Sequence, residues 1–444
     1  MNHRKDKGSA LLVVMLVAMS LSVLGLGITL LSLDEYSSSA EYENHLKALQ
    51  IADAGFNATK SALRGTDFTT VLSTPVQIPE FIAGADDGAF SYRNPLPLLE
   101  ARSIDFMSPP TRTGSRDVFG LLTPRYGIEI GNGRYFAKVS DNDDGDGDIY
   151  FDSDSTVVIR VVGIHRSGPG QSFAYDSTFR NSVAVIESLV RRDASMNVGS
   201  PLTLLGPNVT AEFNGNAFRI QGDSETPGIS ILNDDPDGGD GSAAAQEIYN
   251  SLDTNQRSNV TGASGDFGSL PSIRDDTEEM RESEDEELLK LMDPEFLAEL
   301  LERIPLIADE IYPDGTELSG GDIELGTRDN PQITYVDGDF QLSGSGSGSG
   351  LLVVRGTFDY QGAFNYNGLV LVLGQGELVM GGANKSITGG LLLANLTDDG
   401  FGTASLNLSG NSRFYFDGAK IQMAVNLFPL KTLMWREITP EIEP

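Results

Sequence analysis

The chain of 444 residues contains no cysteine, which excludes a disulfide framework, thiolate chemistry and zinc sites with cysteine ligands. Histidine is almost as scarce, with three in the whole chain, and His3 and His45 lie in the N-terminal segments described below. His165 is therefore the single histidine available to a Ser/His/Asp arrangement, and it ends a β-branched run typical of a strand. We predict that the protein is not an enzyme.

Basic residues are also few. The sequence has 31 lysines and arginines against 64 aspartates and glutamates, a net charge of −33. Because contacts to phosphate require basic surface, we expect no nucleic-acid partner. Soluble cations are better candidate ligands.

One long hydrophobic run stands near the N-terminus. Residues from Ser9 to Leu33 include no charged side chain. Lys7 is the last charged residue before this run, and Asp34 is the first one after it. As a helix this run would be roughly 35 Å long, enough to cross the hydrocarbon core of a bilayer. Basic residues precede the run and acidic residues follow it, so the positive-inside rule places the N-terminus in the cytoplasm. Everything after residue 33 is expected to be exported.

A secretory signal peptide has a shorter apolar region, of about 7–15 residues, although Ser38-Ser39-Ala40 imitates its cleavage site. A plain signal anchor fits the hydropathy equally well. Neither accounts for the order of a short charged leader, Gly8, a small residue and then an uninterrupted apolar helix. That order resembles the leader of type IV prepilins, which a dedicated peptidase cuts after the glycine. The resemblance implies that Gly8 ends the leader and Ser9 begins the mature chain.

The residues beyond the apolar run recur at helical spacing. They predict one amphipathic stripe on a helix that continues out of the bilayer, and we expect it to pack on a globular domain. Within it, the residues from Ala52 to Phe56, ADAGF, resemble the signature of the PilX-type minor pilin family. The predicted packing residues of this spine helix are Leu49, Ala52, Phe56, Thr59 and Leu63.

One position departs from the major pilins. Most of them carry a glutamate as fifth residue of the mature chain, where this sequence has Val13. A carboxylate inside the bilayer costs about 2.5–3.5 kcal/mol, a cost thought to be offset by pairing with the N-terminal amine of a neighbouring subunit. Val13 lacks that pairing group. The resemblance therefore favours an initiating, capping or accessory subunit over a repeating one.

The region 111–197 reads as antiparallel sheet. It contains runs rich in Val, Ile, Tyr and Phe, separated by Gly, Asn, Asp and Ser. A spine helix followed by such a meander is typical of pilins. The predicted strands are Tyr126–Ile130, Arg134–Val139, Thr156–Ile164 and Ser182–Val190.

An acidic turn interrupts this sheet. From Asn142 it reads N-x-D-x-D-G, the beginning of an EF-hand-like calcium loop, but Ser153 stands where the twelfth-position glutamate of an EF-hand would be. The alternatives are a calcium site and a solvated acidic turn. The candidate ligands are Asn142, Asp144, Asp146, Asp148, Asp152 and Asp154.

The C-terminal third contains a weak internal repeat of the form G-x-apolar-x-apolar-x-G. Its starts at Gly338, Gly356 and Gly376 predict coils of about 20 residues, as in the β-solenoids of some exported PilX-like proteins; an antiparallel sandwich is the alternative. Residues 201–221 resemble an early coil. Residues 275–311 read as an acidic helical insertion, and residues 343–350 as a flexible loop that bulges from a coil.

The predicted fold class is α+β and mostly β, with a membrane-spanning spine helix, a β-rich pilin-like domain and a C-terminal β-solenoid. The predicted segments are a leader (1–8), the spine helix (9–64), an irregular connection (65–110), the pilin-like domain (111–197), the first coils (198–245), the acidic insertion (246–312), the solenoid (313–430) and a C-terminal tail (431–444).

These features indicate a minor pilin-like component that assembles, primes or caps a type IV pilus-like filament. The expected partners are other pilins, the prepilin peptidase, the inner-membrane assembly machinery and the membrane itself through residues 10–33, with the ectodomain in the periplasm or on the cell surface. One alternative is the tip pseudopilin of a type II secretion system. The other is an anchored polysaccharide-active β-helix enzyme, for which few basic residues are available: Arg355, Lys385, Arg413 and Lys420.

Overall fold

The computed structural model divides into two compact units. The first comprises Met1–Ala62, Val71–Val190 and Thr432–Pro444, and the second comprises Leu63–Thr70 and Arg191–Lys431. The second unit is thus inserted into the chain of the first. The residues described are 7–73, 82–83, 128–130, 133–142, 151–165, 182–192, 196, 198–232, 241–282, 289–382 and 384–438.

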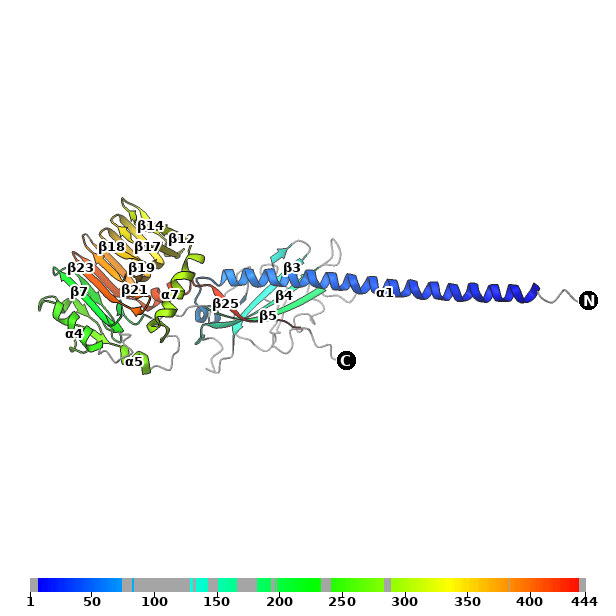
Figure 1. Ribbon diagram of the computed structural model, residues 1–444, viewed down its shortest axis with the longest axis horizontal. Helices are drawn as coiled ribbons and strands as arrows, with labels where there is room; N and C mark the ends of the chain where they lie inside the picture. The colour runs from blue at the N-terminus through cyan, green and yellow to red at the C-terminus, as the bar shows by residue number, and fades with distance from the viewer. Residues whose placement is uncertain are drawn as a thin grey trace, which may run out of the picture. The chain divides into compact units, whose positions relative to one another are not determined.

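A single helix, α1 (Lys7–Ala62), opens the first unit. It lies close to the predicted range 9–64. Its first half is apolar on every side, whereas its second half buries one stripe against the sheet of this unit, on β3 and β4. Figure 1 shows this second half running along the sheet.

The sheet of the first unit has the order β1-β3-β4-β5-β25, with β2 paired to β3. Strands β3 and β4 are antiparallel, with Tyr135 opposite Gly163. The ends of β3, β4 and β5 lie within two residues of the predicted ends. The prediction was close because β-branched residues recur in these segments with the two-residue period of a strand. The bounds are β1 (Ile82–Ala83), β2 (Ile128–Ile130), β3 (Gly133–Asp141), β4 (Thr156–His165) and β5 (Ser182–Arg192). The predicted irregular connection also contains helix α2 (Phe68–Ser73).

The prediction of a C-terminal tail at 431–444 was wrong for its first part. Residues Leu430–Ile438 form strand β25, which pairs with β5 and so completes the sheet of the first unit. The chain returns to this sheet after the whole of the second unit. Its partner strand is remote in sequence, and no short-range pattern reveals such a pairing.

The second unit contains a 13-stranded and a 6-stranded sheet, and every pairing described between their main strands is parallel. In the larger sheet Leu351 lies opposite Leu369, and in the smaller one Phe340 lies opposite Phe358. Parallel pairing excludes the antiparallel sandwich. Figure 1 shows β17, β19 and β21 side by side. The strands are β12 (Glu310–Pro313), β13 (Thr316–Leu318), β14 (Ile323–Leu325), β15 (Gln332–Asp337), β16 (Phe340–Leu342), β17 (Ser345–Val354), β18 (Thr357–Tyr360), β19 (Ala363–Gly374), β20 (Glu377–Met380), β21 (Lys385–Thr397), β23 (Thr403–Ser409) and β24 (Ser412–Phe416).

The segment predicted to be an early coil pairs with strands from the end of the chain. Strand β6 (Leu202–Leu205) pairs with β21, β7 (Asn208–Asn214) with β23, and β8 (Arg219–Gln221) with β24. The stack therefore continues through β9 (Ile229–Leu232) to β11 (Ile273–Asp275), while β12 lies at its other end. The segment between β11 and β12 links the two ends.

The boundaries of the acidic insertion, 246–312, need correction. Its first part supplies strands β10 (Val260–Thr261) and β11, which extend the larger sheet. Helix α4 (Gly241–Ser251) precedes both strands and begins before the predicted boundary at 246, within the segment predicted as first coils. Helices α5 (Thr277–Glu282) and α7 (Pro294–Arg303) follow β11, and Asp293 caps α7 by accepting from the Glu295 N–H.

Two cores stabilise the second unit. One lies between the two sheets and includes Phe340, Phe358 and Tyr366. The other covers part of the outer side of the larger sheet, where Leu351, Leu369 and their neighbours meet α7 and α8 (Gly418–Val425). Burying both faces explains the continuous apolar runs of these strands.

Residues 343–350 are largely strand, not the flexible loop that was predicted. Within β17, a Cβ on Gly348 would lie 2.5 Å from the Tyr366 ring, and Gly350, with φ of 122°, lies against the Gln332 backbone. The alternating glycines are thus required by close approach of neighbouring chains.

Candidate functional site

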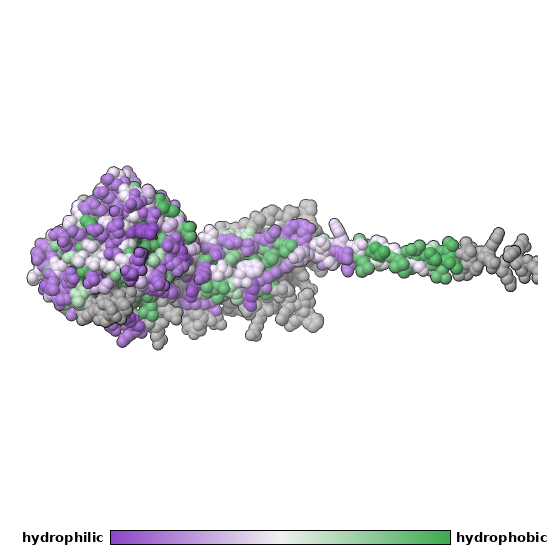
Figure 2. All heavy atoms as spheres, viewed as in Figure 1, coloured by the Kyte–Doolittle hydropathy of each residue, from purple (hydrophilic) through white to green (hydrophobic). Residues whose placement is uncertain are grey.

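The first half of α1 presents an apolar surface. Between Val13 and Leu33 the large hydrophobic side chains are 53–73% exposed, and the helix has the length and composition to cross a membrane. Figure 2 shows this stretch as a mainly green band. A surface of this kind is stable in water only if lipid or protein covers it.

The predicted cleavage residues Gly8 and Ser9 lie in the first turns of α1, where the structure describes the backbone alone. Val13 follows one helical turn later and is 60% exposed. The predicted processing site therefore falls at the start of the helix.

The second half of α1 contacts the sheet through small residues. A Cβ on Gly163 of β4 would lie 2.5 Å from the Ala52 nitrogen, and a Cβ on Gly55 would lie 2.5 Å from the Tyr135 ring. Ala48 and Ala52 are fully buried at this contact. The ADAGF motif thus has a packing reason, because glycine and alanine let the helix backbone approach β3 and β4.

The predicted packing stripe is buried in most positions. Ala52, Phe56 and Thr59 are buried, and the Thr59 hydroxyl donates to the Gly55 carbonyl oxygen at 2.8 Å. Leu49 is only half-buried, and Leu63 lies just beyond the end of α1 although its side chain is fully buried.

The returning strand β25 is held to the first unit by charged groups. Glu187 of β5, only 1% exposed, accepts from Arg160 Nε at 2.7 Å and from Arg436 Nη2 at 2.6 Å. His45 of α1 lies 2.7 Å from Glu437, and Lys60 donates to the Thr432 hydroxyl at 3.3 Å. These contacts could not be predicted from local sequence patterns, because each joins residues far apart in the chain.

The acidic turn is described at its two ends. Asn142 Nδ2 donates to Asp154 Oδ2 at 3.0 Å, and the Thr156 N–H donates to both Asp152 and Asp154, each at 3.0 Å. These bonds fix the entry to β4. Asp144, Asp146 and Asp148 lie outside the described residues. Among the described residues no group of three or more His, Cys, Asp or Glu side chains is placed to hold a metal.

The four basic residues that an enzyme of this fold could use differ in their solvent exposure and in their partners. Lys385 is only 1% exposed, and burial lowers its pKa to about 8 despite the opposing charge of Asp359. Arg355 pairs with Asp337 at 3.2 Å. Arg413 is exposed on the larger sheet, and Lys420 is half-buried in α8.

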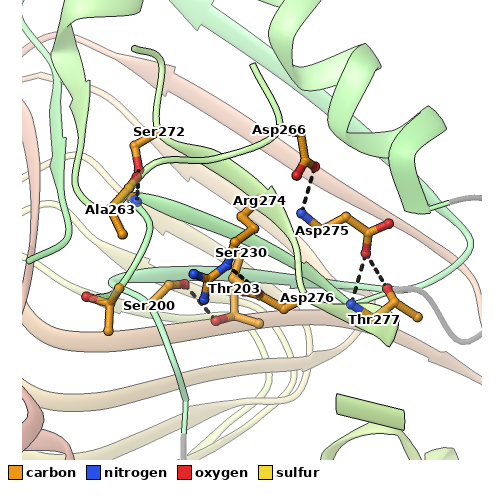
Figure 3. Close-up of polar contacts among 12 residues, drawn as sticks. Ser200, Thr203, Ser230, Ala263, Asp266, Ser272, Arg274, Asp275, Asp276 and Thr277 are labelled. Atoms are coloured by element: carbon orange, nitrogen blue, oxygen red, sulfur yellow. Dashed lines mark hydrogen bonds and ion pairs between the residues drawn. The ribbon is translucent and has the colours of Figure 1, made fainter. Parts of the chain in front are cut away.

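A buried polar cluster lies near one end of the larger sheet (Figure 3). Thr203, Ser230 and Arg274 occupy matching positions on β6, β9 and β11. Ser230 and Arg274 both donate to Asp276. Burial raises the pKa of Asp276, while those two hydrogen bonds oppose the shift. Because the carboxylate is satisfied internally, the cluster fixes the turn from β11 into α5 and offers no free group for chemistry.

Comparisons with family models, curated proteins and solved structures returned no match for this chain.

Proposed function

We propose that the protein is a minor-pilin-like structural subunit of a type IV pilus-like filament. The observation that carries the proposal is helix α1 itself: one continuous helix that is apolar and exposed in its first half and packed on a sheet in its second half. A pilin needs both halves, one for the membrane and the filament core and the other for its globular domain. A plain membrane anchor needs no such continuity.

The first unit has the two layers that this role requires, a helix and a sheet. A helix covers one face of a sheet built around β3, β4 and β5, and the contact is tight at Ala52 and Gly163. Tight packing of a long helix on a sheet provides a rigid junction between a membrane segment and an ectodomain.

The second unit is proposed to be a β-solenoid that the first unit displays. Parallel pairing of successive strands in two sheets supports this fold. Its entry and exit are tied together, since Arg192 donates to the backbone oxygens of Asn426 and Thr66 (the latter at 2.7 Å) and the Gly65 N–H donates to Asn426 at 2.8 Å. An inserted domain with joined ends can be large without disturbing the fold that carries it.

Val13 and the size of the second unit favour a position at the end of a filament. A subunit without the carboxylate that pairs with neighbouring amines gains little from a place deep in a stack. A terminal subunit also leaves its display domain unobstructed. We further propose that the ectodomain is exported and that the acidic turn between β3 and β4 binds calcium.

The experiment is immunogold labelling of sheared filaments with an antibody against the second unit. We expect gold at filament ends or isolated points, and loss of filaments on deletion if the subunit primes assembly. A Val13→Glu variant tests the positional argument, since it restores the pairing group and should move label into the shaft. Regular labelling along the shaft by the wild-type protein would contradict the terminal role. Complete absence from filaments would contradict the filament role itself.

A further inference from the structure

The outward side of the larger sheet carries two columns of polar side chains, which together we call the polar face. The first column crosses five neighbouring strands, and its members are Ser347, Asn365, Ser386, Arg413 and Arg219. The second column lies two residues further along the strands and comprises Asn367, Thr388, Tyr415 and Gln221. Neighbouring members are one strand spacing apart, about 4.8 Å.

The alternating residues of the same strands point into the core. Phe364, Tyr366, Ile387 and Phe414 are at most 2% exposed. The strands that carry the polar face are therefore backed by a well-packed hydrophobic core. The register of the sheet fixes the positions of the polar side chains.

Two arginines lie next to each other on this face. Arg413 of β24 is directly in register with Arg219 of β8, and both side chains are exposed. Like charges at paired positions of adjacent strands destabilise a sheet. In a chain of net charge −33, acidic neighbours are the common case, so this pairing of two cations is unexpected on stability grounds.

Acidic residues close to the two arginines along the chain are otherwise engaged. Asp223 accepts from the backbone N–H groups of Glu225 and Thr226, each at 2.8 Å, and Asp417 caps α8 by accepting from the Lys420 N–H at 3.2 Å. Arg413 Nε donates to the neutral Asn411 side chain at 3.2 Å. Among the described residues neither Arg219 nor Arg413 has an ion pair with an acid.

The surrounding side chains suit a sugar polymer. Half-buried Tyr415 offers an aromatic ring beside Arg413 on the same strand. The Ser386 hydroxyl donates to Asn365 Oδ1 at 2.8 Å, which leaves the Ser386 oxygen as an acceptor and the Asn365 amide nitrogen as a donor, and Gln221 adds a further exposed amide. Aromatic rings pack on the apolar faces of pyranose rings, while amides and hydroxyls bond to sugar hydroxyls. The strand spacing is close to the length of one sugar unit in an extended chain.

We propose that the polar face binds an acidic polysaccharide, with Arg219 and Arg413 each holding carboxylate groups of the polymer. Guanidinium groups bind carboxylates through two parallel N–H donors, which favours carboxylate sugars over neutral ones. An anion between the two arginines also removes their mutual repulsion. The proposal does not depend on the filament role.

The test measures binding of the full-length protein in detergent to immobilised polygalacturonate, a polymer with one carboxylate per sugar, at physiological salt. Dextran serves as the neutral polymer, and duplex DNA serves as a polyanion without sugar carboxylates. The variants are Arg219→Ala/Arg413→Ala and Arg219→Lys/Arg413→Lys. The matched control is Arg355→Ala, which removes an exposed arginine of the same unit that pairs with Asp337. Unchanged melting temperatures verify folding, since the two target side chains are exposed.

We expect wild type and Arg355→Ala to bind polygalacturonate equally, and neither to bind dextran. The double alanine variant should lose affinity by about tenfold or more, and the double lysine variant by several-fold, because lysine keeps the charge but loses the paired donors. Three outcomes overturn the proposal: no binding by wild type at millimolar sugar, binding that the double alanine variant retains, or equal affinity for DNA.

Discussion

Gly163 of strand β4 lies directly against Ala52 of helix α1, so closely that a Cβ on the glycine would be 2.8 Å from the alanine Cβ. The contact joins helix α1 to the sheet of the first unit. It explains why small residues occur in α1 at this level, where a longer side chain would push the helix away from β3 and β4.

We predict that Gly163→Ala lowers the free energy of unfolding by about 1–3 kcal/mol, because the added methyl group overlaps the backbone of α1. Denaturant unfolding of the full-length protein in detergent measures this. The matched control is Gly199→Ala, where nothing lies within 4 Å of the added Cβ. Equal stability of the two variants would show that α1 is not packed as described.

We predict that Glu187→Gln destabilises the first unit by about 3 kcal/mol or more, because it removes the carboxylate shared by Arg160 and Arg436 in a buried site. Limited proteolysis should then release the C-terminal strand β25 more readily. The control is Glu43→Gln, which removes an exposed carboxylate paired with Lys47 on α1 and should leave proteolysis unchanged. A silent Glu187→Gln variant would contradict the pairing of β25 with β5.

We predict that the free energy of unfolding rises with pH because of buried Lys385. Burial lowers its pKa in the folded chain to about 8, and the Nζ donates to the Gly381 carbonyl oxygen. The unfolded chain, with a lysine pKa of about 10.4, binds a proton in this range that the folded chain does not. The free energy of unfolding should therefore increase by about 1.5 kcal/mol between about pH 8 and about pH 9.5.

The measurement is denaturant unfolding of the second unit at both pH values. Unfolding is followed by far-ultraviolet circular dichroism, which reports the β-sheet backbone and does not depend on a tryptophan signal. Lys385→Met should abolish the rise, whereas Lys431→Met, which removes an exposed lysine, should keep it. At higher pH the effect should end, because burial raises the pKa values of Tyr360 and Tyr366 and their ionisation then favours unfolding. A rise that persists in Lys385→Met would assign it to other groups.

For the acidic turn we predict that millimolar calcium raises the melting temperature of the wild-type protein and that Asp144→Asn/Asp146→Asn abolishes the rise. Calcium binding to the folded form alone stabilises it by mass action. Magnesium at equal concentration serves as the control cation. If wild type shows no rise, the turn is a solvated acidic loop.

Local patterns explain how much of this fold could be predicted. The apolar run of α1 and the β-branched runs of β3, β4 and β5 each carry their own period, so their limits were close to those observed. The G-x-apolar-x-apolar-x-G repeat likewise marked strands such as β16 and β18, whose apolar residues face the inner core.

Non-local pairings account for what could not be predicted. Strand β25 depends on β5, and β6 depends on β21, both partners being remote in sequence. The glycines of β17 resemble a linker until the neighbouring strands are present to exclude a side chain. The Arg219 and Arg413 pair is invisible in the sequence for the same reason, since β8 and β24 meet only in the folded stack.

The filament proposal is tested most directly by the N-terminus of the mature protein, determined by mass spectrometry after extraction from membranes. Cleavage by a prepilin peptidase predicts a chain that begins at Ser9, because Gly8 would be the last leader residue. A chain that begins at Glu41, after Ser38-Ser39-Ala40, or one that retains the whole segment before Ser9, would contradict the account.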